Sequence, residues 1–285
     1  MNIIVAKSAG YCFGVRDAVN MAYETAEKYG DVYMLGDIVH NEKVVADLER
    51  VGAKVVENLS QVPKNSPVLF RAHGTKIDIW KEAKDKNLNV IDATCPLVHE
   101  IHHEVKKLEE ENRQVIIIGD HGHDEVIAIA DQVTKRKPII ISNPEEASAL
   151  RRYKRAGIVS QSTQMIENLQ EIMNVLLQKV YDLRFVNTIC FPTKRNHERI
   201  KELSVNCDVM IVIGSFTSAN SKRLTELAIQ RNDKSYQVTG KEDLKKDWFI
   251  GVDNVGISAG ASTPDYLIKE VTEQIKTFER ELNNE

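Results

Sequence analysis

The stretch Val90-Ile91-Asp92-Ala93-Thr94-Cys95-Pro96 places a cysteine between a short apolar run and a long, charged, amphipathic segment. A β-branched run of this length predicts a strand, and apolar residues at helical spacing predict a helix. Cys95 is therefore expected at the carboxyl end of a strand, in the turn that leads into a helix. Open α/β sheets bind ligands at that end of their strands, and a helix N-terminus stabilises a thiolate.

Two further cysteines have the same setting. Cys190 follows Phe185-Val186-Asn187-Thr188-Ile189, and Cys12 follows the apolar run 3–5 and precedes Phe13-Gly14. Because the three cysteines recur at similar intervals along the chain, the sequence suggests three similar units.

The whole chain alternates short β-branched runs with long amphipathic segments, a pattern typical of α/β proteins with parallel sheets. Strands are expected near 3–5, 32–35, 53–56, 68–71, 90–92, 115–118, 139–141, 157–159, 184–187, 209–213, 235–238 and 255–258. Helices are expected at 17–29, 98–111, 166–179, 221–231 and 264–282, among others.

Polar loops fall into register when the twelve strands are divided into three groups of four, with the N-terminal strand completing the last group. Each first strand is followed by His40, by His123, or by Ser218 with Asn220, and each third strand by His73, Ser162 or Ser262. One of the three cysteines follows each fourth strand. The groups predict lobes of residues 13–96, 97–193, and 194–285 with 1–12, sharing one central site.

Three thiolates brought together from distant loops suit an iron-sulfur centre, because soft ligands favour such clusters. A 4Fe-4S cluster held by Cys12, Cys95 and Cys190 would leave one iron open to a substrate oxygen. The alternative is three independent buried cysteines, since cysteine is often buried. Cys207 stands at the start of a strand rather than after one, and packing explains it better.

The polar residues in the matching loops suggest an anion site. Imidazoles, hydroxyls and amides that converge there would donate hydrogen bonds to a multiply charged group such as a diphosphate. A surface position is the alternative for any single histidine. His121 and His197 lie outside this pattern.

His99-Glu100-Ile101-His102-His103 matches the H-E-x-x-H pattern of zinc proteases. Acidic and basic residues crowd both sides of this segment, so a solvated helix face is the favoured interpretation.

The usual nucleotide-binding motifs are missing from the sequence. The chain has neither a G-x-x-x-x-G-K-[ST] nor a G-x-G-x-x-G phosphate loop.

Composition and charge exclude several classes of protein. The 285 residues are 42% hydrophobic and 28% charged, with a net charge of −4, so no broad positive field would attract nucleic acid or an anionic membrane. The longest aliphatic runs, such as 115–118, are far shorter than the about 20 residues of a membrane span. Residues 1–7 lack the features of a signal peptide, so a cytoplasmic, reducing location without disulfides is expected.

The sequence as a whole resembles the 4-hydroxy-3-methylbut-2-enyl diphosphate reductase family. The blocks that carry the resemblance are Gly10-Tyr11-Cys12-Phe13-Gly14-Val15, Val39-His40-Asn41, Arg71-Ala72-His73-Gly74, Asp92-Ala93-Thr94-Cys95-Pro96-Leu97-Val98, Gly122-His123-Asp124-Glu125-Val126, Ser218-Ala219-Asn220-Ser221 and Ala259-Gly260-Ala261-Ser262. The resemblance implies a cloverleaf of three lobes around a 4Fe-4S cluster on Cys12, Cys95 and Cys190.

The resemblance also implies the reaction. An allylic diphosphate would receive two electrons and two protons, lose its hydroxyl group as water, and give isopentenyl and dimethylallyl diphosphate. The implied diphosphate ligands are His40, His73, His123, Ser218, Asn220 and Ser262. Glu125, with a hydroxyl relay through Ser162, would deliver protons, and a ferredoxin or flavodoxin would donate electrons. The alternatives are a related reductase of another substrate and a non-catalytic iron-sulfur redox sensor.

Overall fold

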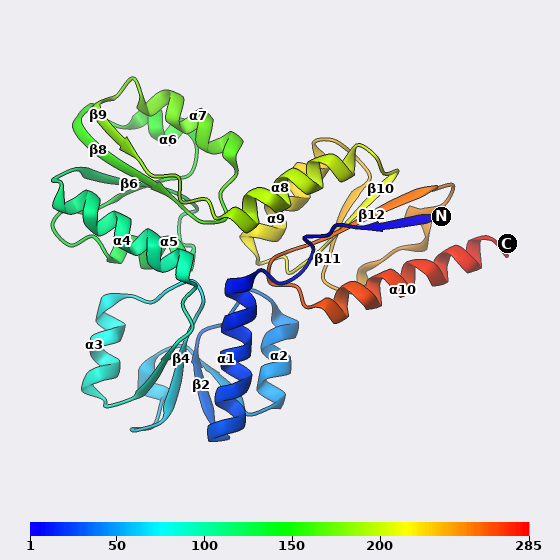
Figure 1. The fold of residues 1–285 in the computed structure, drawn as a ribbon, viewed down its shortest axis with the longest axis horizontal. Helices are drawn as coiled ribbons and strands as arrows, with labels where there is room; N and C mark the ends of the chain where they lie inside the picture. Colours follow the sequence, from blue (N-terminus) through cyan, green and yellow to red (C-terminus); the bar gives the residue numbers. More distant parts are fainter. Residues whose placement is uncertain (285) are drawn as a thin grey trace. The chain divides into compact units, whose positions relative to one another are not determined.

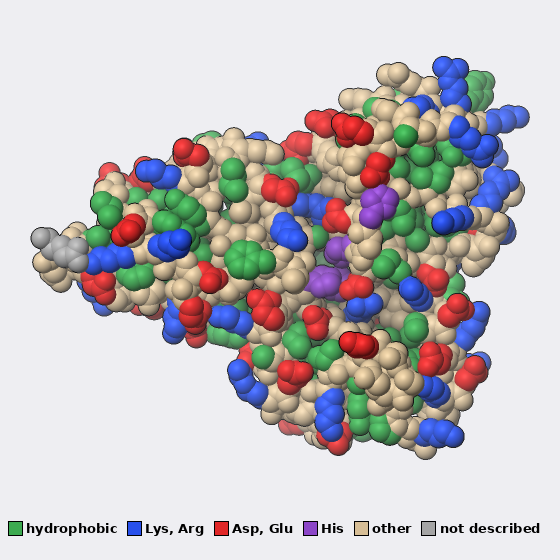
Figure 2. Space-filling model, turned by 180° about the vertical axis from the view of Figure 1, so that it is seen from behind, with side chains coloured by type: hydrophobic (Ala, Val, Ile, Leu, Met, Phe, Trp, Pro, Cys, Tyr) green, Lys and Arg blue, Asp and Glu red, His purple; other side chains and the backbone are tan. Residues whose placement is uncertain are grey.

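The computed structural model describes residues 1–284, which form three four-stranded sheets, each fully parallel and flanked by helices (Figure 1). This confirms the predicted α/β class and the division of twelve strands into three groups. On the face shown in Figure 2, acidic and basic side chains are intermingled.

The first sheet in the chain has the strand order β3-β2-β4-β5. Its strands are β2 (Val32–Leu35), β3 (Ala53–Val56), β4 (Pro67–Phe70) and β5 (Asn89–Asp92). The helices of this part of the chain are α1 (Phe13–Tyr29), α2 (Glu42–Arg50) and α3 (Ile77–Asp85).

The second sheet has the order β7-β6-β8-β9. Its strands are β6 (Gln114–Ile118), β7 (Ile139–Ile141), β8 (Tyr153–Ser160) and β9 (Val180–Phe185). Its helices are α4 (Pro96–Glu110), α5 (Asp124–Asp131), α6 (Pro144–Ala149) and α7 (Ile166–Leu176).

The third sheet has the order β11-β10-β12-β1, and β1 (Asn2–Val5) pairs in parallel with β12 (Asn254–Ala259). The N-terminal strand thus completes the last group, as expected. The remaining elements are β10 (Val209–Ile213), β11 (Ser235–Val238), α8 (Phe191–Ser204), α9 (Ala219–Ile229) and α10 (Asp265–Leu282).

All three sheets share one topology. In each, the second strand lies outside the first, and the third and fourth follow on the other side. The strand order therefore reverses between the first and third strands, at β2/β4, β6/β8 and β10/β12. Loops that leave the carboxyl ends of strands at such a reversal diverge and open a crevice.

Strand β6 shows how the sequence builds these sheets. Ile116 and Ile118 pack into one hydrophobic cluster, whereas Val115 and Ile117 pack into another. Successive side chains of a strand point to opposite faces, so a continuous aliphatic run serves a sheet that is covered on both sides.

The described chain separates into two compact units. One comprises Met1–Val15, His40–Ala46 and the chain from Phe191 onward, and the other comprises Arg16–Val39 and Asp47–Cys190. The sheet of β1, β10, β11 and β12 belongs to the first unit, and the other two sheets belong to the second. The three lobe boundaries drawn from the sequence stay a prediction.

The largest error in the expected strands concerns β9, which spans Val180–Phe185 rather than 184–187. It is an edge strand with exposed Tyr181, so its sequence lacks the aliphatic run of a central strand. Asp182 fixes it by ion pairs to Arg113 and Arg155, both at 2.9 Å. Val180, Leu183 and Phe185 still pack against the hydrophobic cluster of this sheet, but charged residues interrupt them in the sequence.

Within residues 1–284, the structure contains no helix with the length and apolar character needed to cross a membrane.

Gly157→Ala is expected to destabilise the second unit. A Cβ at this position of β8 would lie 2.6 Å from Leu108 Cδ2 of α4, so the helix would have to move. Overpacking of this kind costs about 1–3 kcal/mol, measurable as a lower midpoint of urea unfolding. Lys154→Ala, at an exposed position of the same strand, is the control. An unchanged midpoint in Gly157→Ala would show that α4 does not pack against β8 as described.

Candidate active site

The three cysteines of the predicted cluster lie at junctions between strands and helices. Cys95 is the N-cap residue of α4, Cys190 directly precedes α8, and Cys12 directly precedes α1. All three side chains are half-buried, and none of the four cysteines in the described chain forms a disulfide. A half-buried thiol at a helix N-terminus is in a setting that favours the thiolate.

Each of these cysteines is held by the same backbone hydrogen bond. The amide of Cys12 donates to the carbonyl of Ala261 (3.2 Å), that of Cys95 to Ala72 (3.0 Å) and that of Cys190 to Ser162 (2.9 Å). The acceptors lie in the loops that follow the third strands β12, β4 and β8. Each of these three cysteines is therefore fixed at or next to a predicted site residue: Cys12 near Ser262, Cys95 near His73, and Cys190 at Ser162.

Cys207 differs from the other three cysteines. Its side chain is only 9% exposed, and burial, with a smaller contribution from Asp208, raises the pKa of its thiol. A raised pKa disfavours the thiolate that a metal requires, which agrees with the expectation that Cys207 is a packing residue.

Glu125, the one carboxylate among the predicted site residues, is buried, with 2% exposure. It lies in the first turn of α5, where its own amide donates to Nδ1 of the N-cap residue His123 (3.1 Å). Its Oε1 accepts from the amide of Ser162 (2.6 Å), and its Oε2 accepts from the Ser162 hydroxyl (2.7 Å). The loops after β6 and β8 thus meet at this pair.

His73 and His123 also lie close together in the second unit. Their ring centroids are 5.8 Å apart, and the rings meet edge to face at 81°. An ion pair between Arg71 Nη1 and Asp124 Oδ2 (2.7 Å) ties together the two segments that carry the histidines. The second unit therefore brings together His73, His123, Glu125 and Ser162.

The first unit gathers His40, Ser218, Asn220 and Ser262. The Ser262 hydroxyl donates to the carbonyl of His40 (3.0 Å). Ser218 is the N-cap residue of α9, and its hydroxyl accepts from the amide of Ser221 (3.3 Å). The side-chain amide of Asn220 is buried, and neither its nitrogen nor its oxygen has a hydrogen-bond partner within residues 1–284.

Ser221 is a candidate that sequence reasoning did not single out. Its hydroxyl is fully buried and has no hydrogen-bond partner among the described residues. A Cβ at Gly214 or at Gly260 would collide with this hydroxyl, so the loops after β10 and β12 both approach Ser221 through glycine. Its place directly after Asn220 was the one signal available in the sequence.

The prediction of a solvated histidine segment on α4 is wrong for His102. His99 and His103 are exposed, but His102 is 8% exposed. Burial lowers the pKa of its imidazole to about 4, with smaller contributions from His99 and Lys106. The charged residues around His102 in the sequence predicted a solvated helix face, but His102 itself lies on the buried face of the amphipathic helix.

No group of three or more His, Cys, Asp or Glu side chains within residues 1–284 is arranged to hold a metal ion. Cys12 belongs to the first unit, and Cys95 and Cys190 belong to the second. The three-cysteine centre and the single site shared by the lobes stay predictions.

Comparisons with known proteins agree with the resemblance seen in the sequence. Residues 3–276 match the family described as LytB protein. The chain is 40% identical to 4-hydroxy-3-methylbut-2-enyl diphosphate reductase of Geobacter metallireducens over 98% of both chains, and 38% identical to the Geotalea uraniireducens protein of that name over the full length of both.

Two solved structures are similar as well. The E-1-hydroxy-2-methyl-but-2-enyl-4-diphosphate reductase of Plasmodium falciparum matches 97% of this chain and 87% of its own, with 28% identity and a TM-score of 0.91. A structure described as (E)-4-hydroxy-3-methyl-but-2-enyl diphosphate reductase, the terminal enzyme of the non-mevalonate pathway, matches 97% of this chain and 100% of its own, with 36% identity and a TM-score of 0.71.

Ser162→Ala is expected to lower the free energy of unfolding by about 1.5–3 kcal/mol, because it removes a buried hydroxyl that donates to a carboxylate. Ser162→Thr keeps the hydroxyl and is the matched variant, with a smaller expected loss. Urea unfolding of both variants measures the difference. Equal stability of Ser162→Ala and the parent protein would contradict the hydrogen bond to Glu125.

Proposed function

Because the chain belongs to the LytB protein family, we propose that it is a 4-hydroxy-3-methylbut-2-enyl diphosphate reductase. The reaction adds two electrons and two protons to the allylic diphosphate, cleaves its C–O bond, and releases water with isopentenyl or dimethylallyl diphosphate. The observation that carries the proposal is the repeated link from each cysteine amide to the loop after a third strand, because it fixes three thiols beside polar residues suited to this substrate.

An iron-sulfur cofactor is general in this family, and we propose a 4Fe-4S cluster held by Cys12, Cys95 and Cys190. The donor set fits, because three half-buried thiols at helix N-termini are the soft ligands that iron-sulfur clusters take, whereas the fourth cysteine is buried with a raised thiol pKa. When bound, such a cluster supplies electrons and a Lewis-acidic iron that withdraws charge from the departing oxygen. A ferredoxin or flavodoxin is the proposed electron donor, and the cytoplasm the proposed location.

The proposed diphosphate ligands are His40, His73, His123, Ser218, Asn220 and Ser262. The chain has a net charge of −4, so an anionic substrate must be held by local donors rather than by an overall positive field. The buried amide of Asn220 supports this role, since a buried polar group without a partner is costly unless a ligand or water satisfies it. Ser221 offers a further hydroxyl from the same turn of α9.

Glu125 and Ser162 are the proposed path for protons. A hydroxyl group leaves readily only as water, so an acid must protonate the substrate oxygen as the C–O bond breaks. The Ser162 hydroxyl already lies 2.7 Å from Glu125 Oε2, within the distance of a direct proton transfer. The backbone amide of Ser162 holds the other carboxylate oxygen and fixes the orientation of Glu125.

Anaerobically purified protein is expected to carry about one cluster per chain and to convert the allylic diphosphate with an artificial electron donor over many turnovers. Cys95→Ser should lose both the visible absorbance of the cluster and the turnover. Cys207→Ser, the matched control, should keep both. Turnover without iron would end the proposal, and a bound cluster without multiple turnovers would favour a redox sensor or a related reductase of another substrate.

Glu125→Gln is expected to keep the cluster and the affinity for substrate but to lower the turnover number about 10²–10⁴-fold, the range typical of a lost general acid. The amide is isosteric but delivers no proton. Glu145→Gln, at an exposed position on α6, is the control. A turnover number equal to that of the control would remove Glu125 from the proton path.

A further inference from the structure

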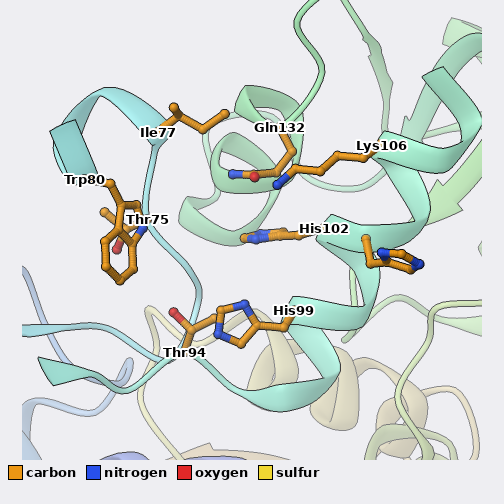
Figure 3. A pocket seen from close by; sticks show the side chains of 9 residues that line it. Thr75, Ile77, Trp80, Thr94, His99, His102, Lys106 and Gln132 are labelled. Carbon is orange, nitrogen blue, oxygen red and sulfur yellow. The ribbon is translucent and has the colours of Figure 1, made fainter. Parts of the chain in front are cut away.

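A cavity of about 410 Å³, here called the Thr75–His102 cavity, opens in the second unit (Figure 3). Its walls come from the segment after β4, from α3, from α4 and from the C-terminal end of α5. None of the residues assigned above to the cysteine centre, the diphosphate or the proton path lines it. The proposed reductase reaction therefore does not account for it.

Two buried polar atoms in its wall have no hydrogen-bond partner within the described chain, namely Thr75 Oγ1 and His102 Nε2. Both side chains are 8% exposed. A buried polar group in a native protein nearly always has a partner, and one left without a partner costs free energy. Both side chains line the same cavity, where a bound ligand or ordered water would supply the missing partners.

The burial of His102 is built into the fold. Gly74 takes a positive φ of 89°, and a Cβ at this position would lie 2.8 Å from His102 Cε1. Only glycine leaves room for the imidazole to enter. Figure 3 shows the His102 ring between Lys106 and Gln132 on one side and His99 on the other, across the cavity from Thr75 and Trp80.

The charge of the wall favours an anion. Nine of the described residues line the cavity, and none of these nine is Asp or Glu. Lys106 is among them, so the wall carries a positive charge and no carboxylate. The nearby carboxylate of Asp92 is occupied, because Oδ2 pairs with His99 (3.2 Å) and Oδ1 accepts from Thr94. Gln132 uses one amide hydrogen on the carbonyl of Ala128 and retains a second.

We propose that this cavity binds a small organic oxyanion, a carboxylate or a phosphate ester, whose charged group is held by Lys106, Thr75 and His102 and whose body lies against Trp80. The cavity volume falls within the range of about 300–1,000 Å³ that is usual for small-molecule sites. The charged group satisfies the two buried polar atoms, and the indole ring supplies an apolar wall. A low imidazole pKa keeps His102 neutral at pH 7, so it binds by hydrogen bonding rather than by charge.

Trp80 gives a direct test in the full-length protein. The chain has two tryptophans, and Trp248, stacked on Tyr236 in the first unit, can be replaced in a Trp248→Phe background that keeps the stack. In that background Trp80 fluorescence reports on the cavity alone. Phenyl phosphate, benzoate and neutral benzamide are titrated separately, so that the two oxyanions are distinguished from each other and from the ring itself.

Phenyl phosphate or benzoate is expected to give a saturable change, with at least about tenfold tighter binding than benzamide. Lys106→Met and Thr75→Val should each weaken that binding about tenfold, the effect of losing one charge-assisted or buried hydrogen bond. Lys107→Met removes the same charge from the neighbouring exposed position and should leave binding unchanged. Thr75→Val keeps the shape of the side chain and removes only the hydroxyl. Circular dichroism spectra of each variant are to match that of the parent, which checks that the variants are folded.

Three results would overturn the proposal: no saturable change with either oxyanion, equal binding of benzamide, or equal losses in Lys106→Met and Lys107→Met. Because the measurement does not use turnover or the cluster, it stands apart from the test of the reductase function.

Discussion

One hydrogen bond, made three times, positions the three candidate cysteines: a cysteine amide after the fourth strand donates to a carbonyl in the loop after the third. The bond is possible because every sheet has the same strand order, which makes its third and fourth strands neighbours. Side chains in these two loops then lie beside the reversal of strand order, where parallel sheets bind ligands. The polar residues of the site depend on this shared topology rather than on any local phosphate-binding motif.

The two units treat their buried polar groups differently. In the second unit, each oxygen of the Glu125 carboxylate accepts a hydrogen bond from Ser162, one from its amide and one from its hydroxyl, which fixes one orientation. In the first unit, Asn220 and Ser221 are buried without partners among the described residues. Buried polar groups without partners are costly, whereas hydrogen-bonded ones add rigidity. The contrast separates a position suited to proton transfer from one suited to holding an anion.

Sequence reasoning predicted the sheets and the cysteine turns well because both rest on local signals. Aliphatic runs such as Ile116–Ile118 identify central strands, and a cysteine between a strand and a helix identifies a turn. It failed where long-range contacts decide the outcome. Strand β9 is recognised only by its pairing with β8 and by ion pairs of Asp182, and Ser221 gains its setting from two glycine loops on other strands. Neither contact leaves a periodic pattern in the chain.

Helix α4 shows why its histidines were difficult to interpret. Cys95 is the N-cap residue of α4, and Val105 and Leu108 lie on its core face. His102, between these two parts of the helix, is directed toward Gly74. The H-E-x-x-H spacing would pair His99 with His103, four residues on. Both of these side chains are exposed, and His99 pairs with Asp92, whereas His102 between them is buried. His102 faces a neighbouring loop that comes close through Gly74, where a Cβ would collide with the imidazole. His102 lies against Gly74, next to His73, so α4 borders both a predicted site residue and the Thr75–His102 cavity.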